Sequence, residues 1–354
     1  MLSKKDLSKK NKADGRTVYS MIFLIIMFSI FIGQLFVSDI TVDTISEKYL
    51  WKEDLIEKYR KFKFDIGDNV FSSAVVGKEG WLFFAGEMSL QNYQKSDPLN
   101  VSNTKKLVAI LSQMDAAVKE YGGTFLVVIP PDKSTIYPQY MPDEIPVIGN
   151  TTSLDRLKER VEKNSDLRLL DLRPVLLQAS NSSQVYYKTD THWNCVGAFY
   201  AYQEILSAVS EDYPNIKTYT IEDFDINSYE WSDFDIAKMM AAKVVDSGVS
   251  FVPRFETKIS LDTDYGSRYD ISSLKVVTNL TKNDQPDLMI FHDSFYDACL
   301  YNFFEPTFGR TISMRYLDVE LAAVLDVIQK EKPKIVVVEF VERLIEVFLW
   351  HLYE

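Results

Sequence analysis

Three residues of this chain have the types and spacing of a serine-dependent acyl-transfer site. Asp190 and His192 stand two positions apart in the stretch YYKTDTHW, and Ser294 lies in the downstream stretch FHDSF. In an extended segment residues i and i+2 point to the same side, so the carboxylate of Asp190 is expected to lie beside the imidazole and to fix its tautomer. An esterase-type site needs a hydroxyl nucleophile, a base and an acid that orients the base. The sequence therefore predicts that Ser294, His192 and Asp190 act together.

Each residue of this predicted triad also has an ordinary structural interpretation. Ser294 could cap the helix that follows it, Asp190 could form a turn, and His192 could be a satisfied core histidine. Their combination favours catalysis, because three uncommon features then agree on one reaction class. We expect His292 and Asp293 to be structural, with Asp293 bonding the backbone of its own turn.

Metal ligands are few in this sequence. The chain has three histidines, His192, His292 and His351, and two cysteines, Cys195 and Cys299. A zinc site needs three or four well-placed ligands, so metal catalysis is not expected, and the chemistry predicted for the triad uses no cofactor.

The two cysteines follow the predicted catalytic residues closely. Cys195 comes three positions after His192, and Cys299 comes five positions after Ser294. If the triad assembles, both cysteines start from neighbouring elements, and a single bridge is one outcome. Two buried free thiols are the simpler expectation, and neither cysteine is expected to be a nucleophile.

Strands and helices alternate along most of the chain. Strands are predicted by the apolar runs TFLVVIP, LRLLDL, DLMIF, RTISM and KIVVVEF, and a hairpin or strand by VVGKEGWLFF. Helical spacing predicts helices from a cap at Ser102-Asn103-Thr104 to Gly122-Gly123, at 154–163, 194–209, 295–303 and 319–329, and at the C-terminus. This order predicts an α/β fold with a mainly parallel sheet. Residues 212–284 lack clear periodicity and are predicted to be an insertion over the site.

The predicted sheet places Ser294 at its carboxyl edge. Ser294 follows DLMIF and precedes a helical run, so its Oγ should be exposed at a strand-to-helix turn. The N–H groups at the start of that helix are suited to stabilise an oxyanion.

Four further residues are candidates for substrate binding. Lys133 and Tyr137 lie in the loop PPDKSTIYPQYMP after a predicted strand, and Arg315 and Tyr316 end the RTISM strand. Open α/β sheets usually bind ligands at the carboxyl ends of their strands. The alternatives are a solvated lysine in a surface loop, and an ion pair between Arg315 and an acidic neighbour.

The N-terminal region predicts a membrane anchor. Residues 17–38 are free of charge for 22 positions, enough for a helix to cross ~30 Å of hydrocarbon. Residues 1–16 carry a net charge of +4, which the positive-inside rule places in the cytoplasm. We therefore predict a juxtamembrane helix at 39–71 and an extracytoplasmic domain at 72–354. A cleaved signal peptide is the alternative.

Composition and charge exclude several classes of protein. An apolar content of 46% excludes wholesale disorder. The formal net charge of −12 becomes −16 once residues 1–16 are set aside, and such an acidic field repels nucleic acid and other polyanions.

Several stretches together resemble a known family. GWLFF, PPDKSTIYPQYMP, YKTDTHWNCVGA, DSF and VVVEFVER resemble the SGNH hydrolase-like, AlgX/AlgJ-type polysaccharide O-acetyltransferases over about residues 70–345. The resemblance implies an SGNH-like three-layer sandwich in which Asp190, His192 and Ser294 match the family's motif positions. It also implies an acetyl-serine, a polysaccharide acceptor outside the cytoplasmic membrane, and a multispanning membrane-bound O-acyltransferase as the source of acetyl groups. A carbohydrate acetyl esterase with the same triad and a non-catalytic glycan-binding scaffold are the alternatives.

Overall fold

The structure is a computed structural model of the 354-residue chain. It describes residues 19–26, 28–29, 50–68 and 71–353. The chain divides into two units, residues 1–58 and 59–354. In the first unit the described residues before position 30 are helical, and α3 (Leu50–Asp65) crosses the boundary between the units.

The predicted membrane anchor lies largely outside the described residues. The basic tail, residues 1–16, lies wholly outside them, as do most of residues 17–38 and the stretch 39–49. Along the described ranges, no helix combines the length and the apolar character that crossing a membrane requires.

Within the described residues, the second unit is built on a seven-stranded sheet with the order β4-β3-β11-β9-β10-β8-β7. Its strands are β3 (Thr124–Ile129), β4 (Leu169–Asp171), β7 (Ile259–Asp262), β8 (Lys275–Asn279), β9 (Asp287–His292), β10 (Arg310–Arg315) and β11 (Ile335–Glu339). β4, β3, β11, β9 and β10 run parallel, whereas β8 pairs antiparallel with both β10 and β7. The predicted α/β fold is therefore confirmed, with an antiparallel edge that makes the sheet mixed.

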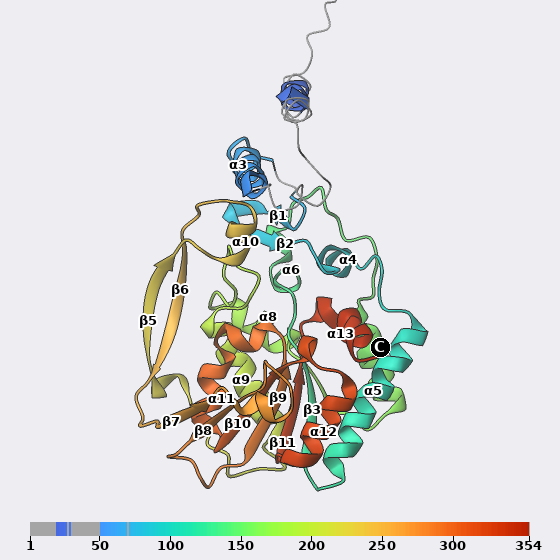
Figure 1. Ribbon diagram of the computed structural model, residues 1–354, viewed down its shortest axis with the longest axis vertical. Coiled ribbons are helices and arrows are strands. Elements are labelled where there is room, and N and C mark those ends of the chain that lie inside the picture. The colour runs from blue at the N-terminus through green and yellow to red at the C-terminus, as the bar shows by residue number, and fades with distance from the viewer. Residues whose placement is uncertain (1–18, 27, 30–49, 69–70, 354) are drawn as a thin grey trace, which may run out of the picture. The chain divides into compact units, whose positions relative to one another are not determined.

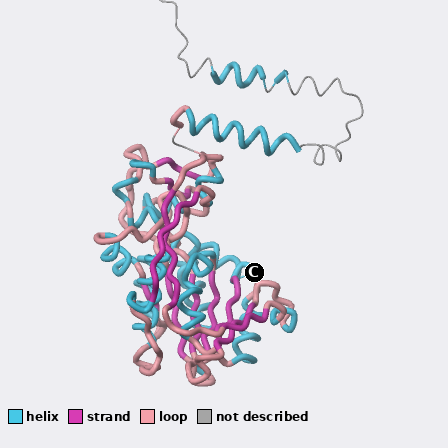
Figure 2. The backbone as a smooth tube through the Cα atoms, turned by 90° about the vertical axis from the view of Figure 1, so that its left-hand side faces the viewer, coloured by secondary structure: helices cyan, strands magenta, loops and turns pink. Residues whose placement is uncertain are grey.

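The antiparallel edge comes from residues 212–284, which the sequence predicted to be one insertion. Besides β7 and β8, this segment holds β5 (Phe224–Trp231) and β6 (Asp246–Pro253), which pair with each other as a separate hairpin. The hairpin runs along the outside of the body, and its upper end lies near α10 (Asp235–Met239) (Figures 1 and 2). Every residue of β5 after Phe224 is exposed, so the strand lacks the apolar alternation by which it could have been recognised.

Helices cover both faces of the sheet. Figure 1 shows α5 and α12 on one side and α9 and α11 on the other, which gives the three layers that the family resemblance implied. Besides α3 and α10, the α-helices described after position 58 are α4 (Ser89–Gln94), α5 (Val101–Lys119), α6 (Lys133–Ile136), α7 (Ser153–Asn164), α8 (Arg173–Ser180), α9 (Cys195–Val209), α11 (Tyr301–Thr307), α12 (Leu321–Glu331) and α13 (Ile345–Tyr353). The core lies along the sheet, where every residue of β11 is buried.

The predicted hairpin near the start of the second unit is confirmed. β1 (Ala74–Val76) and β2 (Leu82–Phe84) pair antiparallel. Trp81, which precedes β2, is buried and stacks on Tyr140, with 4.7 Å between ring centroids.

Helix α5 begins earlier than the predicted cap. The side chain of Asn100 accepts the N–H of Asn103 at 2.9 Å, so Asn100 caps the helix in place of the stretch Ser102-Asn103-Thr104. The helix ends as predicted before Gly122, whose φ of +78° lies in the left-handed region that glycine adopts without strain.

Candidate active site

Ser294 lies at the turn that follows β9, where the sheet meets the next helical segment. The turn is fixed by Asp293, whose Oδ1 accepts the N–H of Phe295 at 2.7 Å and whose Oδ2 accepts the N–H of Val341 at 2.8 Å. The predicted role of Asp293 in bonding its own turn is confirmed. The N–H of Asp293 in turn donates to Glu339 Oε2 at 3.2 Å. Burial, followed by the negative charge of Asp293, raises the pKa of Glu339 well above its usual value.

His292, the last residue of β9, supports the same turn. It is buried, and its Nδ1 lies 2.8 Å from the carbonyl oxygen of Asp293. Burial lowers the pKa of this imidazole, so its neutral form is favoured. These contacts agree with the structural role predicted for His292.

Asp190 and His192 face each other, but their segment is not extended as the sequence predicted. Residues 188–192 form a series of bends. Asp190 Oδ1 accepts the main-chain N–H of His192 at 2.9 Å, which is an Asx-type turn. This turn brings the carboxylate and the imidazole together by a different route from the predicted i, i+2 geometry of a strand.

The structure brings the three predicted residues of the triad into one hydrogen-bonded chain. Asp190 Oδ1 lies 2.6 Å from His192 Nδ1, and His192 Nε2 lies 2.7 Å from Ser294 Oγ. Both distances fall within the reach required of a general base and of the group that orients it. The side chains of Asp190 and His192 are 13% and 19% exposed, so both are largely buried but remain in contact with solvent.

The charge of Asp190 is stabilised by its partner. Burial acts to raise the pKa of Asp190, but hydrogen bonds from His192 and the charge of that ring outweigh it and lower the pKa to about 2. Asp190 is therefore ionised at neutral pH, as an acid that orients a histidine must be.

Lys133 lies buried beneath the bends that carry Asp190. Its Nζ donates to three main-chain carbonyl oxygens, those of Tyr187 at 3.1 Å, Lys188 at 3.0 Å and Asp190 at 2.6 Å. The side chain is 4% exposed, so the alternative of a solvated surface lysine is wrong. Burial lowers the pKa of Lys133 to about 7. Irregular backbone that is buried must find partners for its carbonyl groups, and Lys133 supplies them here.

The other three secondary candidates differ in exposure. Tyr137 is buried and its hydroxyl accepts the N–H of Val185 at 2.9 Å, while Tyr316 is buried against Phe348. Arg315 is exposed and pairs with the carboxylate of Asp297, which is the alternative that the sequence left open for it. Arg315 also borders a cleft of about 250 Å³ that Tyr296, Tyr301 and Glu305 help to line.

Asp235, at the start of α10, is a neighbour of the triad that the sequence analysis missed. Its Oδ2 lies 3.8 Å from His192 Nδ1. In the sequence, Asp235 stands out only as an acidic residue at the start of a short helical run, within a segment that has no clear periodicity.

Asp190, His192 and Asp235 form a group whose ligand atoms all lie within 4.8 Å of one another. The donor set of one imidazole and two carboxylates could in principle hold a metal ion. Asp190 Oδ1 already accepts two N–H groups of His192, and Asp235 Oδ1 accepts the N–H groups of Thr191 and Ile236. Because these bonds occupy oxygens that a metal would need, the group fits hydrogen bonding better than metal ligation.

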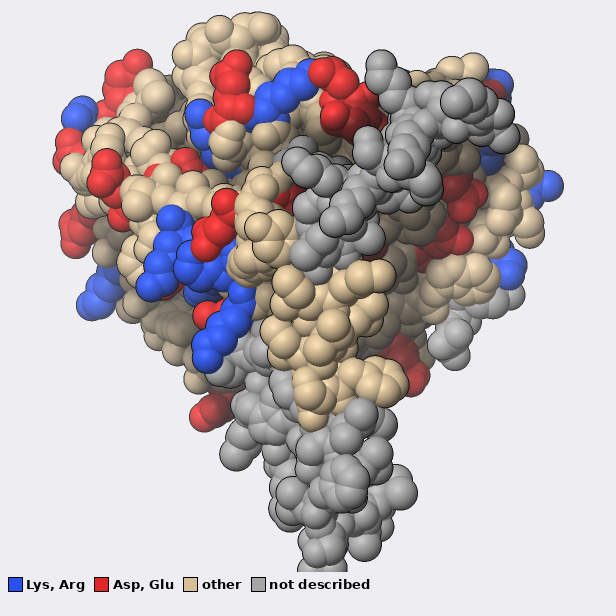
Figure 3. Space-filling model, turned by 90° about the horizontal axis from the view of Figure 1, so that it is seen from above, with Lys and Arg blue, Asp and Glu red and all other residues tan. Residues whose placement is uncertain are grey.

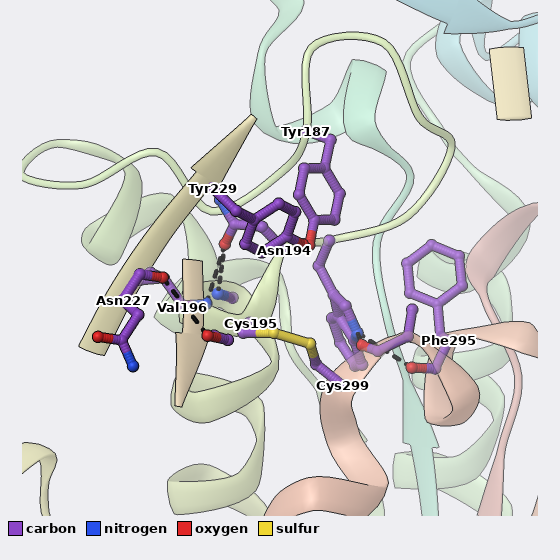
Figure 4. The surroundings of a disulfide bond; sticks show 12 residues. Tyr187, Asn194, Cys195, Val196, Asn227, Tyr229, Phe295 and Cys299 are labelled. Atoms are coloured by element: carbon purple, nitrogen blue, oxygen red, sulfur yellow. Dashed lines mark hydrogen bonds between the residues drawn. A yellow bond between two sulfur atoms is a disulfide. The ribbon is translucent and has the colours of Figure 1, made fainter. Parts of the chain in front are cut away.

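Trp193 and a disulfide join the segment of Asp190 and His192 to the segment of Ser294. Trp193 Nε1 donates to the carbonyl oxygens of Phe295 at 3.0 Å and Ala298 at 2.7 Å. Cys195 and Cys299 form a disulfide between the start of α9 and the segment after Ser294 (Figure 4). The expectation of two free thiols is therefore wrong.

These ties also explain why the predicted helix 295–303 is interrupted. Residues Tyr296–Leu300 form a π-helical turn with non-helical dihedral angles at Ala298 and Cys299, and α11 begins only at Tyr301. The carbonyl groups that accept the indole N–H of Trp193 do not take part in the regular hydrogen bonds of an α-helix. A side chain that takes up these carbonyl groups is a recognised cause of such breaks.

Reducing the disulfide should destabilise the protein. The two cysteines are 104 positions apart, and closing a loop of that length is expected to contribute about 3–5 kcal/mol to the free energy of unfolding. Thermal unfolding with and without reductant measures this difference, and a variant with both cysteines replaced by serine should not respond to reductant. If both thiols of the native protein, prepared without reductant, can be alkylated, the bridge does not form in solution.

Comparisons with known proteins agree with this fold. The family described as "SGNH hydrolase-like domain, acetyltransferase AlgX" matches residues 74–270, more than half of the chain. The match contains Asp190, His192 and Asp235 and ends before Ser294. A protein named "Probable alginate O-acetylase AlgJ" from Pseudomonas syringae pv. tomato is 26% identical over 141 residues, or 40% of this chain. That alignment spans 34% of the curated relative, about a third of its length.

Two solved structures share the fold. Bacillus cereus PatB1, in a structure with a sulfonyl adduct, has a TM-score of 0.56 and 16% sequence identity, covering 77% of this chain and 97% of that one. A DHHW family protein from Eubacterium siraeum has a TM-score of 0.55 and 14% identity, covering 79% and 98% of the two chains. At these identities the likeness concerns the fold alone.

Proposed function

Because the chain belongs to the SGNH hydrolase-like, AlgX-type acetyltransferase family, we propose that it transfers acetyl groups to the hydroxyls of a polysaccharide. The observation that carries this proposal is the hydrogen-bonded chain in which His192 Nε2 lies 2.7 Å from Ser294 Oγ. Such an arrangement activates a hydroxyl for attack on an ester carbonyl.

The proposed first half-reaction forms an acetyl-serine. Ser294 Oγ attacks the carbonyl carbon of an acetyl ester while His192 Nε2 takes the hydroxyl proton. Asp190 keeps Nδ1 of the ring protonated and offsets the positive charge that the ring acquires. Collapse of the tetrahedral intermediate breaks the donor's ester bond, and His192 returns the proton to the departing alkoxide.

The proposed second half-reaction repeats these steps with a sugar. A hydroxyl of the acceptor gives its proton to His192 and attacks the acetyl carbon. Ser294 leaves and recovers the proton from the imidazolium, so the enzyme returns to its starting state. Water in place of the sugar would produce acetate, which is the esterase alternative, and the outcome depends on how well the acceptor excludes water.

We place the acceptor beside Arg315, at the cleft that begins next to the turn of Ser294. The cleft offers the exposed ring of Tyr301 together with charged groups, a combination suited to sugar faces and hydroxyls. Net charge alone does not exclude an anionic glycan, because Lys and Arg side chains gather in one group among the acidic ones on one face of the protein (Figure 3).

The test of the proposed function is an assay with an activated acetyl ester, run with and without an oligosaccharide. We expect the sugar to become acetylated and the yield of free acetate to fall. Arg315→Ala should raise the sugar concentration needed for half-maximal transfer, whereas Arg254→Ala, which removes an exposed guanidinium outside the cleft, should not. Acetate release that added sugar does not change would favour the esterase.

We also propose the location and the partner of the reaction. The uncharged run at residues 17–38 and the basic residues before it support a single-pass anchor with residues 72–354 outside the cytoplasm. No acetyl-CoA pool exists there, so a multispanning membrane-bound O-acyltransferase is the proposed supplier of acetyl groups.

Protease added to intact spheroplasts should digest the region from about residue 39 onward. Digestion that occurs only after lysis would contradict the proposed topology.

A further inference from the structure

Asp235 comes from α10, more than 40 positions after His192 in the sequence. Its side chain is 31% exposed, and its Oδ2 lies 3.8 Å from His192 Nδ1. The imidazole therefore faces two carboxylates from two different elements, and the mechanism above uses one of them.

Hydrogen bonds hold Asp235 against the catalytic loop. Its Oδ1 accepts the N–H of Thr191 at 2.7 Å and the N–H of Ile236 at 2.6 Å. Its own main-chain N–H donates to Asp190 Oδ2 at 3.0 Å. One oxygen of Asp190 thus faces His192 while the other faces Asp235, which fixes the orientation of the Asp190 carboxylate from both sides.

Charged groups from several elements surround the ring of His192. Asp190 and Asp235 face it directly, and Ser294 approaches its other nitrogen. Lys133 on α6 lies behind the main chain and donates to the carbonyl of Asp190. Asp246 on β6 binds the N–H of Thr189 in the same loop and adds a further negative charge.

We propose that Asp235 is a second positioning carboxylate for His192: its side chain holds the N–H of Thr191 and stabilises the imidazolium that forms when Ser294 gives up its proton, while its main-chain N–H orients Asp190. This inference rests on the proposed function. A second negative charge within 4 Å of the ring is worth most when the ring is positively charged, so it acts on the transition state more than on the ground state.

The surroundings of Asp235 give its charge a pH dependence. Burial, followed by the negative charge of Asp190, raises the pKa of Asp235. The main-chain N–H groups of Thr191 and Ile236 donate to Oδ1 and act to lower this pKa, because they stabilise the charged carboxylate. As the pH falls, Asp235 should therefore lose its charge before Asp190, whose pKa is lowered to about 2.

The test uses Asp235→Asn in the whole protein. Asparagine keeps an acceptor oxygen for Thr191 and removes the negative charge. We expect kcat to fall roughly 10- to 100-fold with little change in KM for the sugar, and the acid limb of the pH–rate profile to move to lower pH. Asp235→Glu should recover part of the loss. Asp233→Asn, which removes an exposed carboxylate two positions away, is the matched control and should have no effect.

A second readout needs no catalysis. The chain has three histidines, so the ring titration of His192 can be followed by NMR and assigned by comparison with His192→Gln. In Asp235→Asn its midpoint should move to lower pH by about one unit, a tenfold change in the protonation equilibrium. Asp235→Ser provides a second neutral variant in case asparagine prevents folding.

The outcomes separate the inference from the proposed function. A shifted midpoint in a protein that never acetylates sugar would support the role of Asp235 and contradict the transferase. An unchanged midpoint in a folded neutral variant would overturn the inference, even if wild-type transfer is robust. A loss of activity accompanied only by a lower Tm would also overturn it, because that is what a purely structural residue produces.

Discussion

Replacing Ser294 by alanine should reduce acetyl transfer by a factor on the order of 10⁴–10⁶, because the variant has no oxygen to carry the acetyl group. His192→Ala should cost about as much, since no other base lies at hydrogen-bond distance from Ser294 Oγ among the described residues. Asp190→Asn should cost less, on the order of 10³–10⁴, because it disturbs the tautomer and the charge of the ring but leaves the base in place.

The three residues should behave as one unit. The double variant with Ser294 and His192 both replaced should be scarcely less active than either single variant, since each already removes the same pathway. Transfer rates of the three single variants and the double variant test this expectation. Losses that multiply would mean that the residues act independently, and near-normal transfer by folded Ser294→Ala would leave the glycan-binding scaffold as the better account.

Replacing Lys133 by methionine should have the second-largest effect, although this residue does not touch the reacting atoms. Methionine fills a similar volume but removes the donor of three main-chain carbonyl groups, of which that of Lys188 still accepts the N–H of Leu82 at 2.8 Å. Each of the two carbonyl groups left without a donor costs about 1–3 kcal/mol, so the backbone around Asp190 should move to find new partners. We expect kcat to fall about 100-fold, because a displacement of about 1 Å in a catalytic group has that cost.

The matched control for Lys133 is Lys238→Met on α10, where the same change affects an exposed side chain. Its activity and Tm should stay close to wild type. For Lys133→Met we expect the free energy of unfolding to fall by about 3 kcal/mol, measured by denaturant titration. Unchanged kcat in Lys133→Met would show that the loop keeps its geometry without the ammonium group.

The triad could be predicted because its signals are local. Asp190 and His192 are two positions apart, and Ser294 directly follows an apolar strand whose position in a parallel sheet fixes the edge at which it emerges. The Asx-type turn that joins Asp190 to His192 was not foreseen, yet it gives the same pairing as the extended segment that was predicted. The pairing of Asp190 with His192 could therefore be predicted correctly although the predicted backbone conformation was wrong.

The surroundings of the triad could not be predicted, because they depend on contacts between distant segments. Asp235 belongs to a segment with no periodicity, and only the packing of α10 near the catalytic loop brings it to His192. Lys133 was predicted to bind substrate, with a solvated surface lysine as the alternative, but the carbonyl groups of the irregular loop hold it as a buried donor. The pairing of Cys195 with Cys299 likewise follows from the meeting of α9 with the turn after Ser294.

The central claim is that Ser294 carries the acetyl group between donor and acceptor. Mass spectrometry of the wild-type protein, quenched within one turnover of a labelled acetyl ester in the absence of sugar, tests it most directly. The account predicts one added acetyl group on the peptide that contains Ser294 and its disappearance when oligosaccharide is added. A label on a different residue, or full-rate transfer with no labelled intermediate on Ser294, would contradict it.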